Sequence, residues 1–68
     1  MNSAQLALIA EAEQLIVNRL ALDVSAATKL HDELLESESA AWASGLADDA
    51  KQLRATADNL WAVIQGEI

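Results

Sequence analysis

His31 is the single histidine of this chain, and its neighbours decide whether it could hold a metal ion. A metal site on a helix needs a second ligand three or four residues away, on the same face. Those positions hold Ala27, Thr28, Leu34 and Leu35, and the chain has no cysteine, so zinc would lack its three or four protein ligands. We therefore expect no metal, no cofactor and no catalytic role for His31, which lies at the edge of an apolar helix face.

A run of four carboxylates without a base follows this histidine, at Asp32, Glu33, Glu36 and Glu38. Paired carboxylates do acid–base chemistry only in a cleft that holds their pKa values apart, and 68 residues leave little room for one. Nucleophile–base pairs, HExxH and phosphate-binding glycine loops are also absent from the sequence, so we expect no enzyme. Two interpretations of the run stay open: a solvated face, or a surface that binds Lys and Arg of a protein partner.

Trp42 and Trp61 are the only Phe, Tyr or Trp residues of the chain. Tryptophan is enriched at binding hot spots, and its indole N–H needs a partner or water. For Trp42 the sequence leaves target binding and peripheral core packing open, whereas Trp61 is expected in dimer or core packing. The predicted protein-binding surface therefore comprises Asp32, Glu33, Glu36, Glu38 and Trp42.

The composition limits the classes of partner. Eleven acidic against four basic residues give a net charge of −7, which argues against binding to nucleic-acid phosphates or anionic membranes. The N-terminal segment lacks the features of a signal peptide, and no apolar run approaches the roughly 20 residues needed to cross a bilayer. We expect a cytoplasmic protein that binds neither nucleic acid directly nor membrane.

The elements that must position these residues are predicted to be helices. Fifteen alanines and eleven leucines, with no proline, predict an all-α fold, a two- or three-helix antiparallel hairpin or bundle. We expect one helical domain over residues 1–68, with helices at about 3–21, 25–43 and 46–65. Asn2 and Gln5 fit a capping box at the first helix. Ser44-Gly45 is the one internal break signal, and a single long helix through Gly45 is the alternative.

Two apolar faces indicate how the helices pack. The last helix carries a stripe with four–three spacing, flanked by Trp61, at Leu46, Ala50, Leu53, Ala57, Leu60 and Ile64. The first helix carries one apolar face at Leu6, Ile9, Ile16 and Leu20, and a neighbouring face at Leu8, Ala12, Leu15 and Leu22. A helix that is apolar nearly all round needs more than one partner, and so short a chain is only marginally stable alone. We therefore expect a homodimer that completes its core through these two helices.

These features predict a small acidic protein-binding module, a homodimeric regulator or inhibitor whose acidic face meets a basic surface. The alternative is a secretion-type co-chaperone or an obligate hetero-complex subunit, whose first helix covers a helix of its partner. The size and helical plan are similar to those of plasmid copy-number regulators, phage-encoded inhibitors and type III secretion co-chaperones, but none of their motifs can be placed here. Trp42-Ala43-Ser44-Gly45 is one residue longer than the Trp-x-Gly turn of WXG-type hairpins, and no family is recognised.

Overall fold

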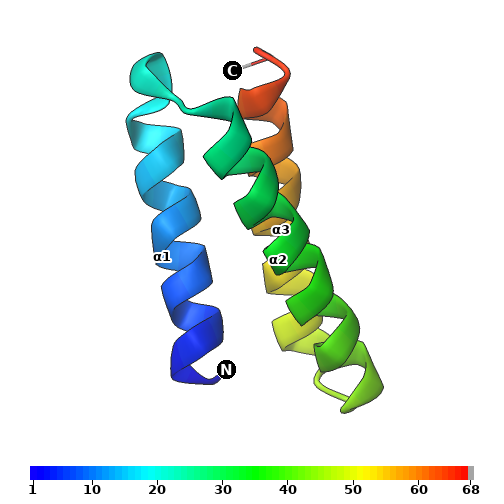
Figure 1. Ribbon diagram of the computed structural model, residues 1–68. Coiled ribbons are helices and arrows are strands. Elements are labelled where there is room, and N and C mark those ends of the chain that lie inside the picture. Colours follow the sequence, from blue (N-terminus) through cyan, green and yellow to red (C-terminus); the bar gives the residue numbers. More distant parts are fainter. Residues whose placement is uncertain (68) are drawn as a thin grey trace.

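The chain folds into three helices that pack side by side with alternating directions, as Figure 1 shows. A computed structural model describes residues 1–67, and Ile68, the last residue of the expected domain, lies outside the described residues. Residues 1–67 contain no strand. The prediction of an all-α fold with helices packed on one another is confirmed. The elements are α1 (Ser3–Val17), the short 3-10 helix η1 (Arg19–Ala21), α2 (Val24–Ala43) and α3 (Ala47–Ile64).

Helix α1 begins with the expected capping box. The Asn2 side chain accepts a hydrogen bond from the Gln5 backbone N–H at 2.8 Å, and the Gln5 side chain accepts one from the Asn2 N–H at 3.1 Å. The helix ends at Val17, before the expected residue 21, because Asn18 leaves helical geometry with φ −98° and ψ 31°. The Arg19 guanidinium donates to the Ile16 carbonyl oxygen at 3.3 Å and satisfies part of this helix end.

The turn between α2 and α3 is closed by a glycine in the left-handed region. Gly45 has φ +75°, a conformation that costs a residue with a Cβ about 1–2 kcal/mol. The Leu46 N–H donates to the Ala41 carbonyl oxygen at 2.9 Å, and the Gly45 N–H donates to that of Trp42 at 3.1 Å. This pair of bonds is a Schellman motif, which ends α2 and reverses the chain. The alternative of one long helix through Gly45 is wrong.

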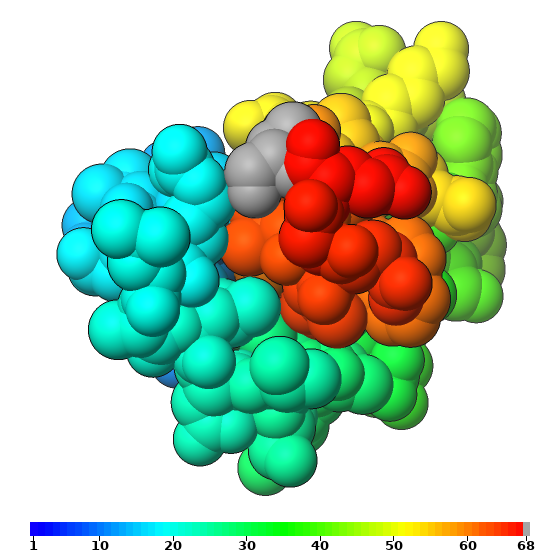
Figure 2. Space-filling view, turned by 90° about the horizontal axis from the view of Figure 1, so that it is seen from above, coloured from blue at the N-terminus to red at the C-terminus, as the bar shows by residue number. Residues whose placement is uncertain are grey.

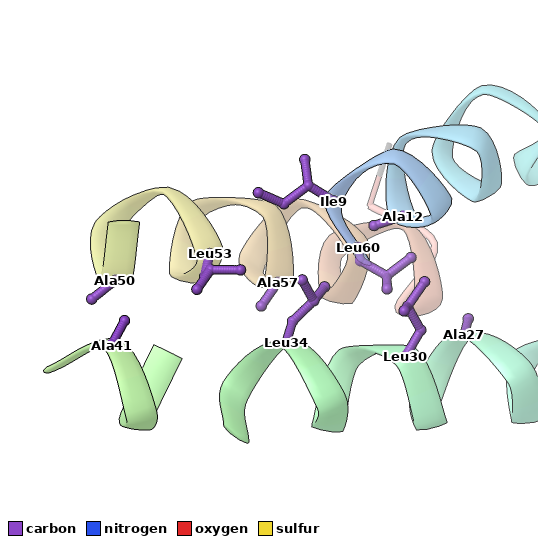
Figure 3. Close-up of a cluster of buried hydrophobic side chains, with 10 residues drawn as sticks. All are labelled: Ile9, Ala12, Ala27, Leu30, Leu34, Ala41, Ala50, Leu53, Ala57 and Leu60. Atoms are coloured by element: carbon purple, nitrogen blue, oxygen red, sulfur yellow. The ribbon is translucent and has the colours of Figure 1, made fainter. Parts of the chain in front are cut away.

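The core lies mainly between α2 and α3, which make the most extensive contact of the three helix pairs. Small and large buried side chains alternate along α3, at Ala50, Leu53, Ala57 and Leu60, and the buried face of α2 places Leu30 and Leu34 between Ala27 and Ala41. Figure 3 shows Ala41 facing Ala50 near the turn, and Leu34 pointing toward α3. Helix α1 adds few buried side chains, chiefly Ile9 and Ala12. The remaining buried apolar residues are Ala27, Leu30 and Leu34 with Ala41 on α2, and Ala50, Leu53, Ala57, Leu60 and Val63 on α3.

The apolar stripe predicted on the last helix is therefore covered by the chain itself. Its four central residues are completely buried, namely Ala50, Leu53, Ala57 and Leu60. They cannot face a second copy, so the expectation that this stripe forms a dimer interface is corrected for them. The two ends of the stripe also differ: Leu46 precedes α3 as its N-cap residue and is 48 % exposed, whereas Ile64 is only partly buried. Val63 is buried instead of Ile64 at this end.

Candidate protein-binding surfaces

Three of the four predicted carboxylates lie together on the outer face of α2. Asp32, Glu33 and Glu36 line a shallow open hollow whose other walls are Val24, Ser25, Thr28 and Lys29. All seven residues belong to α2, so the hollow is the outward surface of one helix and offers no cleft for acid–base chemistry. Within residues 1–67, Glu33 and Glu36 have no ion-pair partner, whereas Asp32 Oδ1 lies 3.4 Å from His31 Nδ1. This acidic α2 surface, defined as Asp32, Glu33 and Glu36, is available to a cationic partner.

The negative charge of the chain is concentrated on this helix. Between residues 23 and 43 stand five acids against the single base Lys29, which gives −4 of the total −7. Residues 1–22 contribute −1 from Glu11 and Glu13 against Arg19, and residues 44–68 contribute −2. Residues 1–22 thus carry the smallest share of the negative charge, and residues 23–43, which are α2 with its N-cap Asp23, carry the largest.

Glu38 and Trp42, also predicted for the binding surface, lie apart from the hollow. Glu38 Oε2 accepts a hydrogen bond from the Trp42 indole N–H at 3.1 Å, and Glu38 Oε1 lies 3.5 Å from Arg54 Nη1 on α3. Arg54 Nε also donates to Asp58 Oδ1 at 3.0 Å. The hydrogen bond to Asp58, and then the charges of Asp58 and Glu38, raise the pKa of Arg54 above its ordinary value. The charge of Glu38 is therefore met within the chain and is not part of the acidic α2 surface.

A second contact joins α2 to α3 on the same side as Arg54. The rings of His31 and Trp61 lie with centroids 5.0 Å apart at an interplanar angle of 36°. His31 is thus an aromatic packing neighbour of Trp61. Within residues 1–67, no three His, Asp or Glu side chains are grouped so as to hold a metal ion.

Helix α1 buries a different face from either one predicted. Its inward residues are Gln5, Ile9 and Ala12, which lie between the two apolar faces of the sequence. Ile16 is partly buried, as are Leu8, Leu15 and Leu22 of the neighbouring face. By contrast, exposure reaches 53 % at Leu6, 71 % at Val17 and 102 % at Leu20. Leu6 and Leu20 were expected in a buried seam, but Leu6 lies on the outer side of α1, and Leu20 falls in η1, past the helix end.

The exposed aliphatic side chains of this first segment form the outer α1 surface, defined as Leu6, Val17 and Leu20. The view along the helices in Figure 2 shows the cyan connection between α1 and α2 projecting beside the red end of α3. Leu20 belongs to this connection and Val17 ends α1 beside it, and both are largely exposed to water. In the described part of the chain, no helix is both long and apolar enough to span a membrane. Because its three aliphatic side chains are each more than half exposed, the outer α1 surface is a candidate contact for another protein chain.

Sequence reasoning missed the links between α2 and α3 on this molecule's surface. The spacing of Arg54 and Asp58, four residues apart, signals their pairing on one helix. The reach of Arg54 to Glu38 and of His31 to Trp61 depends on how α2 and α3 are aligned, which no local pattern shows. Comparisons with protein-family models, curated proteins and solved structures find no match for this chain.

Proposed function

We propose that this chain is a small acidic protein-binding module that regulates or inhibits a protein target. The observation that carries the proposal is the apolar surface left uncovered once the three helices have packed. Seven large apolar side chains stay exposed in 67 described residues: Leu6, Val17, Leu20, Val24, Trp42, Leu46 and Trp61. Exposed apolar side chains that lie near one another mark sites of protein interaction, and Val17 and Leu20 lie three residues apart where α1 ends. The charge of −4 on residues 23–43, α2 with its N-cap Asp23, favours a basic surface on the target.

The proposed module works as a homodimer in which the outer α1 surfaces of two copies meet. Residues 1–22 hold the two most exposed large aliphatic side chains, Val17 and Leu20, and the smallest share of the negative charge, −1, so two copies repel each other least along this segment. Contact through α2 and its N-cap Asp23 would instead bring two charges of −4 together. Dimerisation along α1 also leaves the acidic α2 surface free for the target.

A second candidate function is supported by the same outer α1 surface. In an obligate hetero-complex subunit or a secretion-type co-chaperone, Leu6 and Val17 would cover a helix of a different protein. Leu20 favours this alternative because it lies in η1, outside the regular helix. Its side chain can therefore contact a partner whose shape differs from that of this chain. The two functions differ in the mass of the purified chain in solution, a homodimer against a monomer that awaits its partner.

Charge reversal on the acidic α2 surface is expected to abolish target capture. We expect Glu33→Lys with Glu36→Lys to reduce, at least tenfold, the amount of the main protein recovered from source cells by the tagged chain. The reason is that both carboxylates are free of ion pairs within residues 1–67, and their reversal replaces attraction to a basic surface by repulsion. Quantitative mass spectrometry of the captured proteins measures the effect.

The matched control is Glu11→Lys with Glu67→Lys, which changes the net charge by the same amount at exposed positions outside α2. The control is expected to capture the target as the unchanged chain does. Equal capture by the α2 variant and the unchanged chain would refute acidic docking. Equal loss in both variants would show that total charge, and no particular surface, governs binding.

A further inference from the structure

Both tryptophans lie on one flank of the α2–α3 pair. On α2, residues 24, 31, 35, 38 and 42 follow one another at intervals of seven, four, three and four. On α3, residues 54, 58 and 61 follow at intervals of four and three. Such spacing places each set on one face of its helix. The His31–Trp61 ring contact and the Glu38–Arg54 ion pair join the two faces. We call this surface the tryptophan flank, made of Val24, His31, Leu35, Glu38 and Trp42 with Arg54, Asp58 and Trp61.

Helix α1 packs on the opposite side of the α2–α3 pair and leaves this flank open. The start of the chain shares a hollow with Ala40 and Asp49, through Met1, Asn2 and Gln5. Ala40 stands two positions from Trp42, which is about 200° around a helix. Figure 1 shows α1 standing to one side of α2 and α3. Trp42 and Trp61 are accordingly 48 % and 43 % exposed, and no described helix covers them.

We propose that the tryptophan flank binds an amphipathic helix of the target protein that carries lysine and arginine beside its apolar stripe. This inference rests on the proposed function and names the chemistry of the partner. The charge of the flank indicates which partner it favours: its charged side chains are Glu38, Arg54 and Asp58, a net −1, and Arg54, the flank's one cation, is already held by the two carboxylates, on a chain of net charge −7. A second copy of this chain would bring the same negative charge against it, whereas a cationic helix is attracted.

The spacing of the aromatic groups fits one helix laid along the flank. Trp42 and His31, the neighbour of Trp61, are eleven residues apart, which is about 16 Å at 1.5 Å per residue. Positions i and i+11 of a bound helix lie on one face at that same separation, with i+4 and i+7 between them above Leu35. Arginine side chains beside the stripe would stack on the exposed indoles and meet the nearby carboxylates. The partner segment is thus a three-turn helix with apolar residues at i, i+4, i+7 and i+11.

A designed peptide tests this surface without knowledge of the target. The probe is an 18-residue helix of leucine and lysine with its leucines on one face, and its control has the same composition with the leucines scattered. We expect the amphipathic peptide to bind at least tenfold more tightly than the scattered one by isothermal titration calorimetry. Backbone amide NMR shifts of the unchanged protein are expected to change along the tryptophan flank.

Variants of the protein assign the binding to the two indoles. Trp42→Ala and Trp61→Ala are each expected to weaken peptide binding about tenfold, whereas the control Val17→Ala on α1 leaves it unchanged. Equal affinity for the two peptides, or shifts confined to the outer α1 surface, would overturn the proposal. The NMR shifts are measured on the unchanged protein, so they show whether the peptide binds at the tryptophan flank even where an alanine variant fails to fold.

Failure of this inference is distinguishable from failure of the proposed function. If Glu33→Lys with Glu36→Lys abolishes target capture while the tryptophan variants bind the amphipathic peptide normally, the flank is excluded and acidic docking stands. The opposite result is that the peptide changes the NMR shifts of the tryptophan flank, that both tryptophan variants bind it more weakly, and that the charge reversal leaves target capture unchanged. This result would support the flank and refute acidic docking.

Discussion

Replacing Leu53 by alanine is expected to lower the free energy of unfolding by about 2–5 kcal/mol, the range measured for large-to-small changes in packed cores. Leu53 is completely buried between the helices and lies at the centre of the α3 stripe (Figure 3). Proteins are stable by roughly 0.05–0.15 kcal/mol per residue, which is about 3–10 kcal/mol for 68 residues. The single substitution therefore removes a large share of the stability of the fold.

Urea unfolding followed by the helical circular dichroism signal measures this loss, at one fixed protein concentration because association shifts apparent stability. Leu46→Ala is the matched control, since it is a leucine of the same stripe that the structure places half exposed at the N-cap of α3. We expect this control to change the free energy of unfolding by less than about 1 kcal/mol. A Leu53→Ala protein as stable as the Leu46→Ala protein would contradict the buried position of the stripe.

The second large effect is expected from enlarging a small, completely buried residue in the packed contact between α2 and α3. Ala57 is completely buried on α3, where Leu34 points toward that helix from α2 (Figure 3). Leucine at this position adds three carbon atoms where there is no space, and such overpacking typically costs 1–3 kcal/mol. We expect Ala57→Leu to lower the urea midpoint accordingly.

Ala55→Leu is the control that separates the effect of overpacking the core from the effect of replacing an alanine by leucine in this helix. Ala55 is an exposed residue of the same helix, two positions away, and leucine has nearly the helix propensity of alanine. The control is expected to stay within about 0.5 kcal/mol of the unchanged protein. If both leucine variants were equally stable, the two helices would not meet at Ala57.

Much of the fold followed from local patterns in the sequence. The stripe through Ala50, Leu53, Ala57 and Leu60 was predictable because a buried helix face repeats every three or four residues whatever it packs against. The capping box of Asn2 and Gln5 was predictable because its hydrogen bonds join residues close in the chain. Periodicity could not say that the stripe packs within the chain, since an intrachain helix and a second copy impose the same spacing.

The orientation and end of α1 were beyond local patterns. Leucine, isoleucine and alanine surround most of this helix, so the face that turns inward is chosen by the fit of small residues such as Ala12. Leu20 and Ala21 have high helix propensity and do not signal a helix end, yet both lie in η1, after α1 has ended. Leu20 is consequently the most exposed large apolar residue among residues 1–67.

The candidate site was predictable in part. Sequence proximity grouped Glu38 with Glu36, but two residues correspond to about 200° around a helix, so their side chains leave α2 in nearly opposite directions. The partners that hold Glu38 and His31 come from α3, at Arg54 and Trp61. Such pairs follow from the alignment of two packed helices and are outside the reach of spacing rules. Homodimer formation and acidic docking stay predictions.

Sedimentation equilibrium of the purified 7.2 kDa chain tests most directly the claim that a second chain covers the apolar surface left by intrachain packing. We expect a folded species of twice that mass at micromolar concentration. We also expect Val17→Ser with Leu20→Ser, on the outer α1 surface, to shift the chain to monomer while its helical signal is retained. A folded monomer at every concentration, with or without these substitutions, would contradict the homodimer.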